Sequence, residues 1–424
     1  MAVSLISLTL LGTLISGLYP AFVLTSFQAV QAVKGNVIQK HRKFGLRQIM
    51  VVFQFVASIT LILGTFLVIK QLNYMRSQDL GFSTEQMLVL KGASSSKSLV
   101  ELEERLRIFK NEVLQMQAVK SHAVSSNIPG VENFGISGYH SKHYPDELRS
   151  IYRVGIDEFF LSQFEVELLA GRNFKKELVT DTLAVILNDV AVKHMGFNSP
   201  EEAIGEKLNP NAERFRWNII GVVSSYHQAS LKEEMDPIAF FYRPNGGDFY
   251  SIKLSTNDFR AAVAEVEGAW DDIFPDNPFD FFFMDEFFNR QYKTDEQFNS
   301  VFIGFAGLAI FVACLGLFGL VSFSAEQNKK QIGIRKVLGA SVFKVVILLA
   351  RDYTMLIIMA LFIAFPLGYF LMKSWLQGFA YQTTIGVDIF IFGALIIFLI
   401  SIITVSFKSF GAANANPVKA LRED

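Results

Sequence analysis

The chain has 424 residues, of which 51% are hydrophobic, 13% aromatic and 19% charged, and its formal net charge is -1. This composition is apolar for a soluble protein but too charged for a chain lying wholly in lipid, so we expect a membrane protein with a large aqueous part. The balanced charge excludes the bulk basic character of a nucleic-acid-binding protein. The single cysteine, Cys314, excludes an intrachain disulfide and a site built from several cysteines.

Five apolar runs are long enough to cross the roughly 30 Å hydrocarbon core of a bilayer. The first lies within residues 1–27, and its length and the lack of a positively charged leader distinguish it from a signal peptide. The other four are expected at 48–70, 298–323, 353–372 and 389–407. The sequence therefore predicts an α-helical polytopic membrane protein with five transmembrane helices.

Lys and Arg residues set the predicted orientation of these helices. They are concentrated in the loop 28–47, in the segment 324–352 and in the tail 408–424, which all lie on the same side. Because Lys and Arg accumulate in short cytoplasmic loops, we place these three segments in the cytoplasm. The outer loop 373–388 and the long segment 71–297 then lie outside the cytoplasm.

Residues 71–297 contain no run that could span a membrane and are expected to fold as an inserted extracytoplasmic α+β domain. Two strand–helix–strand units are predicted, over 87–124 and over 250–284, each with a helix whose apolar residues recur every three or four positions. Two such units are typical of a split βαβ, ferredoxin-like arrangement. Four further strand candidates would build a second subdomain, at 151–156, 184–187, 217–223 and 238–242.

Polar and small residues inside the apolar runs predict particular contacts and helix boundaries. Gln54 is expected to form an interhelical hydrogen bond rather than to line a transport path. Arg351 and Asp352 would be costly in mid-bilayer, so we expect an interfacial helix at 341–350 and a separate span after it, kinked near Pro366. Small residues let helices approach closely, and the third run offers a candidate helix-packing face at Gly304, Gly307, Gly316 and Gly319.

The segment 326–341 reads Glu-Gln-Asn-Lys-Lys-Gln-Ile-Gly-Ile-Arg-Lys-Val-Leu-Gly-Ala-Ser and lies between the third and fourth runs. Its four cations against one acid fit a cluster that sets topology and binds anionic lipid head groups. They also fit an element that docks on a cytoplasmic partner. The charge pattern alone leaves both interpretations open.

A short internal repeat connects the two ends of the chain. Residues 416–422, Asn-Pro-Val-Lys-Ala-Leu-Arg, follow the last span and resemble residues 28–34, Gln-Ala-Val-Gln-Ala-Val-Lys, which follow the first. We therefore expect the first span to end one repeat and the other four spans to form a second. Most of the first repeat would then be missing from this chain.

Three groups of residues resemble the permeases of ABC transporters of the MacB/FtsX-like family, in their long two-repeat form. Residues 330–341, Lys-Gln-Ile-Gly-Ile-Arg-Lys-Val-Leu-Gly-Ala-Ser, are similar to the family's cytoplasmic signature, and residues 415–422 are similar to its closing motif. The outer domain adds short motifs that begin at Gly171, Val185, Ala203 and Ile219. The chain departs from the family at Gln331, where an acid is usual, and in the absent first half.

The resemblance implies a membrane subunit without ATPase activity, whose outer part is a MacB-like periplasmic core domain. A separate ABC ATPase would bind ATP and Mg²⁺ and move the outer domain by mechanotransmission, for export or efflux. In agreement, no Gly-x-x-x-x-Gly-Lys-Ser/Thr loop occurs in the sequence. The residues implied to contact this ATPase are Glu326, Ile332, Gly333, Ile334, Arg335, Lys336, Leu338, Gly339 and Ala340.

The resemblance further implies a multi-pass protein of the bacterial inner membrane that works as a dimer or with a second permease repeat. The main alternative is signalling without transport, in which the same motion activates an outer-face protein such as a cell-wall hydrolase or a sensor kinase. An enzyme is the weakest interpretation. His140 and His143 have the spacing of a metal pair, but no third ligand follows at a suitable spacing. We therefore expect no catalytic or metal-binding residues and no cofactor in this chain.

Overall fold

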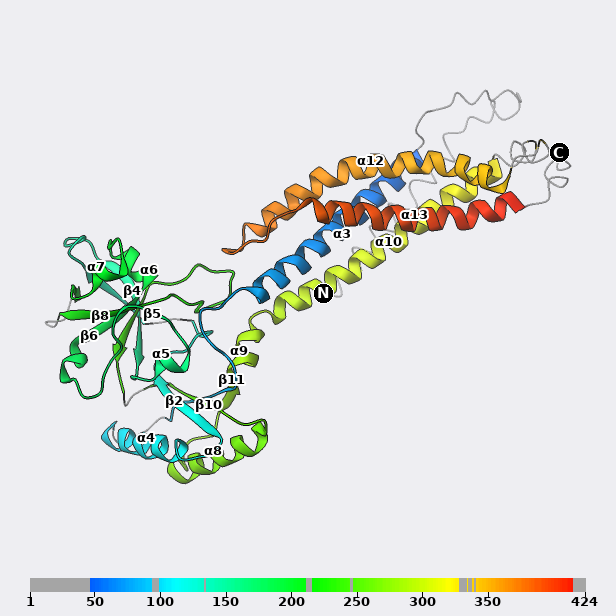
Figure 1. Cartoon of the computed structure of the whole chain (residues 1–424). Helices are drawn as coiled ribbons and strands as arrows, with labels where there is room; N and C mark the ends of the chain where they lie inside the picture. The colour runs from blue at the N-terminus through cyan, green and yellow to red at the C-terminus, as the bar shows by residue number, and fades with distance from the viewer. Residues whose placement is uncertain are drawn as a thin grey trace, which may run out of the picture.

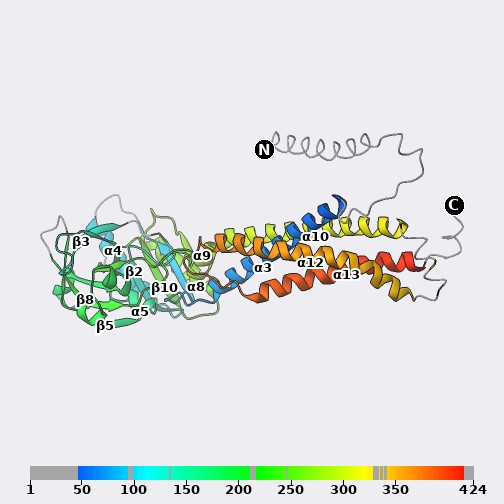
Figure 2. The same ribbon diagram turned by 90° about the horizontal axis from the view of Figure 1, so that it is seen from above.

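The computed structural model describes two single residues, 334 and 338, and six stretches of chain: 46–93, 99–132, 135–210, 216–244, 247–327 and 341–414. The predicted first span and most of the loop after it lie outside these residues. In the described part, four long helices form a bundle, and an α+β domain lies at one end of it (Figure 1). The view from above shows the same elongated arrangement (Figure 2).

The four bundle helices are α3 (Leu46–Ser77), α10 (Lys293–Gln327), α12 (Val342–Leu376) and α13 (Val387–Asn414). Each contains a stretch that is long and apolar enough to cross a membrane: Arg47–Ser77, Asp295–Ser324, Tyr353–Leu376 and Val387–Phe407. Four of the five predicted spans are thus present as helices, and the remaining one lies outside the described residues.

α12 differs from the prediction of a separate interfacial helix. A single helix runs from Val342 to Leu376, and Arg351 and Asp352 lie inside it. No Gly or Pro occurs between 342 and 365, so nothing in the sequence breaks the helix at the charged pair. The apolar part nevertheless begins at Tyr353, directly after that pair.

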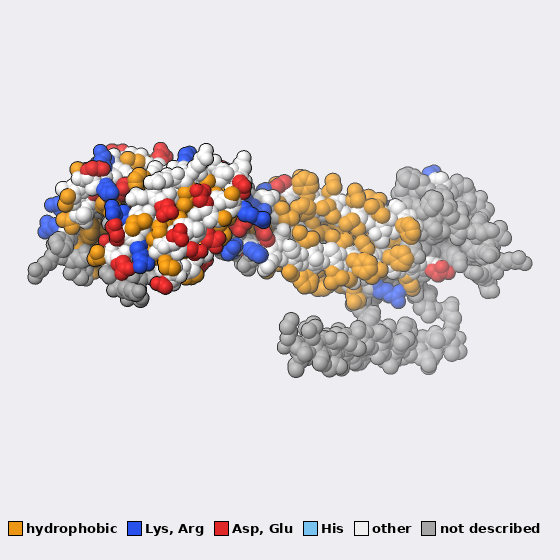
Figure 3. Space-filling model, turned by 90° about the horizontal axis from the view of Figure 1, so that it is seen from below, with side chains coloured by type: hydrophobic (Ala, Val, Ile, Leu, Met, Phe, Trp, Pro, Cys, Tyr) orange, Lys and Arg blue, Asp and Glu red, His pale blue; other side chains and the backbone are white. Residues whose placement is uncertain are grey.

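α3 lies at the centre of the bundle and packs against α10, α12 and α13. Their shared core contains Phe55, Ile59 and Leu63 of α3 with Ala360 and Ala364 of α12. The outward faces of the helices carry a continuous band of apolar side chains, whereas charged side chains cover the outer domain (Figure 3). This contrast is expected where one half of a protein contacts lipid and the other contacts water.

The outer domain contains the predicted ferredoxin-like half. Its first unit is β1 (Met87–Lys91), α4 (Leu99–Val113) and β2 (Val119–Ser125), and its second is β10 (Phe249–Leu254), α8 (Phe259–Ile273) and β11 (Phe281–Phe283). The strand order is β11-β1-β10-β2, with antiparallel neighbours throughout. The two predicted strand–helix–strand units are confirmed, and each is split by a strand of the other. Both helices bury apolar side chains on the sheet, where the rings of Phe109 and Trp270 lie 5.3 Å apart.

A second subdomain is inserted between β2 and β10. Its strands are β3 (Ile136–His140), β4 (Arg149–Ile156), β5 (Leu168–Gly171), β6 (Ala184–Asn188), β7 (Lys207–Pro210), β8 (Trp217–Val223) and β9 (Ile238–Tyr242). Six of them close into a ring in the order β4-β3-β7-β8-β6-β9, because β9 pairs back on β4. A closed ring exposes fewer unpaired strand edges to other chains. Short helices connect the strands: α5 (Phe160–Gln163), η1 (Val179–Leu183), α6 (Asp189–His194) and α7 (Pro200–Ala203).

Gly171 and Arg172 fix the turn after β5. Gly171 has φ +77°, and a Cβ there would overlap the carbonyl oxygen of Ile220, so only glycine fits. Arg172 donates two hydrogen bonds of 2.7 Å to the carboxylate of Asp181, which is fully buried. The outer-domain motif that begins at Gly171 therefore has a structural role.

The two subdomains meet at a buried ion pair. The Lys110 Nζ atom of α4 lies 3.2 Å from Oδ2 of Asp157, which follows β4. The other carboxylate oxygen of Asp157 accepts hydrogen bonds from the backbone N–H groups of Phe159 and Phe160. Burial raises the pKa of Asp157 to about 6, although the Lys110 charge acts in the opposite direction. Burying the Asp157 carboxylate between the two subdomains therefore costs solvation free energy.

Candidate functional site

The strongest candidate for a functional site is the junction between the bundle and the outer domain. α3 leads from the bundle into β1, and α9 (Met284–Arg290) leads from β11 back into α10. The loop 377–386, which connects α12 to α13, reaches the same level and contacts the segment 224–237 between β8 and β9 (Figure 1). All four bundle helices therefore connect to the outer domain at this junction.

Backbone hydrogen bonds attach the loop 377–386 to the outer domain. The N–H of Ala380 donates to the carbonyl oxygen of Lys232 at 2.9 Å, and the N–H of Tyr381 donates to that of Leu231 at 3.4 Å. Phe379 is 8% exposed and packs in the same hydrophobic cluster as Leu231. The loop is therefore held by its main chain and by a buried ring.

Gln71 ties the same loop to α3. Its side chain is fully buried, and its Nε2 donates to the carbonyl oxygen of Tyr381 at 2.8 Å. Its Oε1 accepts a hydrogen bond of 2.8 Å from the N–H of Thr383. One amide group thus satisfies two backbone groups of the loop, which would otherwise be buried without partners.

His227 provides the ring contact on the outer-domain side. It is 4% exposed, and its ring meets that of Tyr381 edge to face, with centroids 4.7 Å apart. Its backbone N–H donates to the carbonyl oxygen of Leu80 at 3.0 Å, which joins the segment 224–237 to the chain leaving α3. Burial lowers the pKa of His227, and the charge of Asp79 offsets part of this effect. The imidazole is therefore neutral at neutral pH.

Ion pairs surround this buried centre and connect different elements: Lys70 with Asp388 (2.9 Å), Arg76 with Glu296, and Lys232 with Asp295 (2.8 Å). The first two join α3 to α13 and to α10, and both are substantially exposed, so each contributes little stability. The third joins the outer domain to α10, and the side chain of Asp295 is 17% exposed. Of the three pairs, it is the best shielded from solvent.

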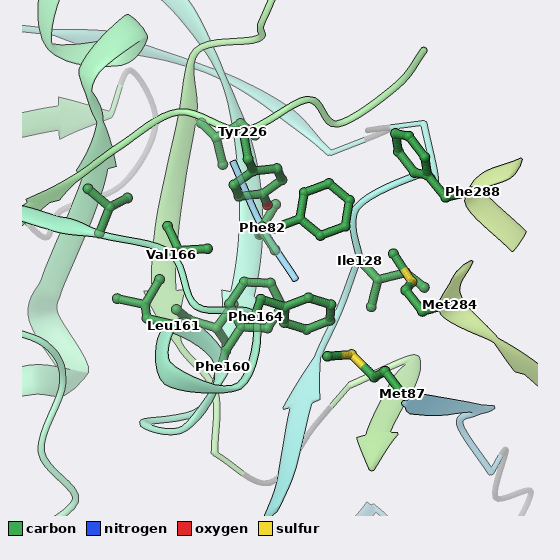
Figure 4. Close-up of a cluster of buried hydrophobic side chains, with 14 of the residues drawn as sticks. Phe82, Met87, Ile128, Phe160, Leu161, Phe164, Val166, Tyr226, Met284 and Phe288 are labelled. Atoms are coloured by element: carbon green, nitrogen blue, oxygen red, sulfur yellow. The ribbon is translucent and has the colours of Figure 1, made fainter. Parts of the chain in front are cut away.

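Aromatic side chains fill the space beneath these contacts. Phe82, which follows α3, lies among Tyr226, Phe164 and Phe288, with ring centroids 5.8, 6.4 and 5.5 Å away (Figure 4). Tyr226 belongs to the segment 224–237, Phe164 follows α5, and Phe288 lies on α9. These rings pack the chain that leaves α3 against three different elements of the outer domain.

At the end of the bundle away from the outer domain, α10 ends at Gln327 and α12 begins at Val342 (Figure 1), and most of the coupling residues inferred from the sequence fall between these two positions in the chain. Glu326 lies in the last turn of α10. Ile334 and Leu338 are 47% and 80% exposed, and the N–H of Leu338 donates to the carbonyl oxygen of Ile334 at 3.0 Å. The others lie outside the described residues: Ile332, Gly333, Arg335, Lys336, Gly339 and Ala340.

The four glycines of α10 do not share one packing face within this chain. A Cβ at Gly316 would overlap Oε1 of Gln54, whereas a Cβ at Gly304, Gly307 or Gly319 would have no atom of the described residues within 4 Å. Gly307 and Gly316 are nine positions apart, which at about 100° per residue places them on opposite sides of the helix.

Gln54 does not form the predicted interhelical hydrogen bond within the described residues. Its Oε1 is buried without a partner against Gly316. Ser58, one turn further along α3, forms such a bond instead, because its Oγ donates to the carbonyl oxygen of Ala309 on α10 at 2.9 Å. The short hydroxyl reaches the backbone of the neighbouring helix at this close approach.

His143, one of the two histidines considered as a possible metal pair, forms a contact with a carboxylate instead. The Nε2 atom of His143 lies 3.0 Å from Oε1 of Glu202, an interaction that joins two parts of the second subdomain. Across the described ranges, no group of three or more His, Cys, Asp and Glu side chains is arranged to hold a metal ion.

Sequence comparison finds a related domain and a related protein. Residues 303–416 match the family model described as FtsX-like permease C-terminal. The macrolide export ATP-binding/permease protein MacB of Bdellovibrio bacteriovorus is 25% identical to this chain over 258 residues. The match covers 57% of this chain and 38% of the MacB protein, so the chain spans about two fifths of that relative's length.

Structural comparison gives distant similarities to outer domains. The periplasmic region of MacB from Actinobacillus actinomycetemcomitans has a TM-score of 0.35 and 14% identity, and the match covers 50% of this chain and 95% of that one. The extracellular domain of the ABC-type transporter YknZ from Gram-positive bacteria has a TM-score of 0.32 and 13% identity, with 46% and 97% covered.

An apolar helix bundle with an α+β domain at one end defines a membrane protein with an extracytoplasmic domain. The family match falls on α10, α12 and α13 and includes the loop that docks at the junction. Residues 303–416 match the FtsX-like permease C-terminal family, and the chain is similar to a MacB protein, as the sequence motifs predict.

Proposed function

We propose that this chain is the membrane subunit of an ABC transporter and couples ATP hydrolysis in a separate subunit to motion of the outer domain, for export or efflux. The observation that supports this most strongly is the junction: the loop 377–386 is bonded both to α3, through Gln71, and to the outer domain, through Leu231 and Lys232. A movement that starts at the inner ends of the helices therefore has a direct mechanical route outward.

The partner ATPase would dock on the segment between α10 and α12 and would bind ATP and Mg²⁺. Exposure of Ile334 and Leu338 supports this, because exposed apolar side chains at a short turn suit a protein interface. Arg335 and Lys336 would steer the segment toward an acidic cleft. Gly333 and Gly339 would permit close approach of the two backbones.

Docking is tested by co-purification with the candidate ATPase subunit. We expect Arg335→Glu and Gly339→Leu each to lower recovery of the ATPase at least tenfold. Lys193→Glu, which makes the same charge change on an exposed side chain of the outer domain, is the matched control and should bind normally. Unchanged binding in both segment variants would contradict the coupling proposal.

Transmission is tested separately, with the complex in nanodiscs and Cys314 replaced by Ala. Spin labels at Lys207 of the outer domain and Leu395 of α13 report the distance between the two parts by pulsed electron resonance. We expect ATP to change this distance in the parent and not in Gln71→Leu, while ATP hydrolysis continues. An unchanged ATP response in Gln71→Leu would show that the junction does not carry the motion.

The setting of this activity is also proposed. We expect the chain in the bacterial inner membrane, with the outer domain in the periplasm. We also expect it to work as a dimer or with a second permease repeat, because a two-site ATPase would need a second coupling segment beside the one at 326–341. Transport predicts that a small molecule or a lipoprotein stimulates ATP hydrolysis by the complex. Stimulation by an outer-face protein alone would indicate signalling instead.

A further inference from the structure

We propose that the helix bundle binds one acyl chain of a membrane phospholipid, in a groove between α3, α10 and α12 on the side of the bundle nearest the outer domain. The groove has a volume of about 300 Å³. α10 and α12 both pack along α3, and the lining includes Gly64 and Val68 of α3, Phe298 and Phe302 of α10, and Leu371 and Trp375 of α12. The proposal depends on the bundle lying in a membrane and not on the proposed transport function.

The lining of this acyl-chain groove offers almost no polar partners. Thr60 has the only hydroxyl group among the lining side chains, and its Oγ1 donates to the carbonyl oxygen of Val56, one turn back on α3, at 2.8 Å. A buried water molecule needs about two to four polar partners, which this lining does not provide. A hydrocarbon chain needs none and gains from contact with apolar side chains.

The size of the groove favours an acyl chain over a helix of a second copy. A helix about 10 Å across fills roughly 400 Å³ with each turn of about 5.4 Å. The whole groove has about 300 Å³, less than one such turn. Phe298 and Leu371 are exposed, so the groove opens on the surface of the bundle that meets lipid, and a chain can enter from the bilayer.

Two glycines shape the groove in different ways. A Cβ at Gly368 would lie 2.9 Å from Cδ1 of Leu63, so this glycine allows α12 to approach α3 closely. A Cβ at Gly64 would have only Phe302 within 4 Å among the described residues, at 3.8 Å, which is an ordinary contact. Gly64 is therefore the position from which a larger side chain would extend into the groove without displacing a helix.

Trp375 connects the groove to the junction. It packs against the core of the bundle and also against the hydrophobic cluster that contains Phe379 of the loop 377–386. The rings of Trp375 and Phe379 have centroids 4.7 Å apart, and the Phe379 ring in turn lies 5.6 Å from Nζ of Lys232 in the outer domain. Filled, the groove gives Trp375 packing partners on its bundle side; empty, it leaves those contacts unmade. An acyl chain in the groove should therefore stabilise the docked loop.

Lipid retention tests the site. The full chain is reconstituted with a phosphatidylglycerol that carries a dibrominated stearoyl chain, transferred to detergent and weighed by native mass spectrometry. The parent should retain one phospholipid per chain, and Gly64→Leu should lower this retention at least tenfold. Gly64→Ala, which adds one methyl group, and Gly304→Leu, where a Cβ meets no atom of the described residues within 4 Å, are the matched controls and should retain the lipid as the parent does.

Tryptophan fluorescence tests where the retained chain lies, because bromine quenches a nearby indole. Trp217 and Trp270 belong to the outer domain, whereas Trp375 lines the groove. The retained lipid should quench fluorescence in the parent and in Gly304→Leu. It should not quench the fluorescence of Trp375→Phe, in which only the outer-domain tryptophans remain.

Hydrogen exchange at the Ala380 amide, which donates to Lys232 of the outer domain, tests the effect on the junction. Stripping the retained lipid from the parent should accelerate this exchange at least tenfold, and adding the phospholipid back should reverse the change. In Gly64→Leu the leucine side chain fills part of the groove, so exchange should stay slow with or without lipid. Slow exchange in this variant also shows that its loss of lipid is not a loss of fold.

Three results would overturn the proposal: equal lipid retention in the parent and in Gly64→Leu, quenching that persists in Trp375→Phe, or exchange at Ala380 that does not respond to lipid in the parent. The same mass spectra report the ratio of dimer to monomer. If Gly64→Leu changed that ratio and left the retained lipid unchanged, the groove would be an interface between copies of the chain and the acyl-chain site would be wrong.

Discussion

Replacing Gln71 with Leu should release the loop 377–386 from α3 without unfolding the protein. The substitution removes the partners of the Tyr381 carbonyl oxygen and the Thr383 N–H, both of which bond to a side chain that is fully buried. A buried backbone group left without a partner costs about 1–3 kcal/mol. Allowing for the apolar packing that Leu adds, we expect loop opening to become easier by about 2–4 kcal/mol.

Amide hydrogen exchange measures this change directly. Because each 1.4 kcal/mol corresponds to a factor of about ten, exchange at the Thr383 amide should accelerate roughly 30- to 1,000-fold. The Ala380 amide, which donates to Lys232 of the outer domain, should accelerate with it if the loop opens as a unit. Gln115→Leu, at an exposed glutamine of the outer domain, is the matched control. If Thr383 kept its protection in Gln71→Leu, the assigned role of Gln71 would be wrong.

Three further predictions concern folding. Gly171→Ala should cost about 3 kcal/mol or more and lower the unfolding temperature of the outer domain by roughly 6–12 °C in calorimetry, whereas Gly205→Ala, with φ +83° but open space, should lower it far less. For Asp157→Asn, the free energy of unfolding in urea should rise by up to about 3 kcal/mol relative to that of the parent between pH 4 and pH 6. The reason is that the raised pKa of Asp157 in the folded state makes the parent lose stability as pH rises, whereas Asn does not titrate. A difference that stays constant with pH would contradict this. Gly316→Leu should reduce the thermal stability of the nanodisc-embedded monomer and Gly304→Leu should not; equal effects would contradict the observed packing.

Periodicity in the sequence predicted much of this fold because strong local signals coincide with tertiary burial. The helix at 99–113 and the strand at 238–242 have long apolar patterns, and both were identified. β5 and β7 were not, because each has only four residues and owes its strand geometry to pairing with β8. α12 was divided in the prediction because the cost of a charged pair in lipid was treated as a helix break, whereas a helix can cross the interface intact.

The junction was less predictable, because its contacts join residues far apart in the chain. Tyr381 lies in the predicted outer loop 373–388, but its contact with His227 depends on how that loop and the segment 224–237 meet. Gln71 stands out in the sequence as a polar residue directly after an apolar run. Its hydrogen-bond partners could not be identified from the sequence, because they lie more than 300 residues away along the chain. The basic segment near Arg335 has a strong sequence signal, but most of it lies outside the described residues.

His227 should make docking of the loop 377–386 sensitive to acid. Its pKa is lowered by burial, so its contribution to stability is complete above the unfolded value near 6.5 and is lost as pH falls through the folded value. Protonation places a charge against the Tyr381 ring in a site that is 4% exposed, and the nearby Asp79 compensates only in part.

Exchange at the Tyr381 amide, corrected for the intrinsic pH dependence of exchange, should therefore accelerate as pH is lowered below 6.5. His227→Phe keeps an aromatic ring in the same space and should remove this pH dependence. His143→Gln is the matched control, because His143 lies in the second subdomain and pairs with Glu202, and this variant should keep the pH dependence. An acid response that persists in His227→Phe would assign it to another group. The pairing of a neutral imidazole with Tyr381 would then be a packing contact without a role in releasing the loop.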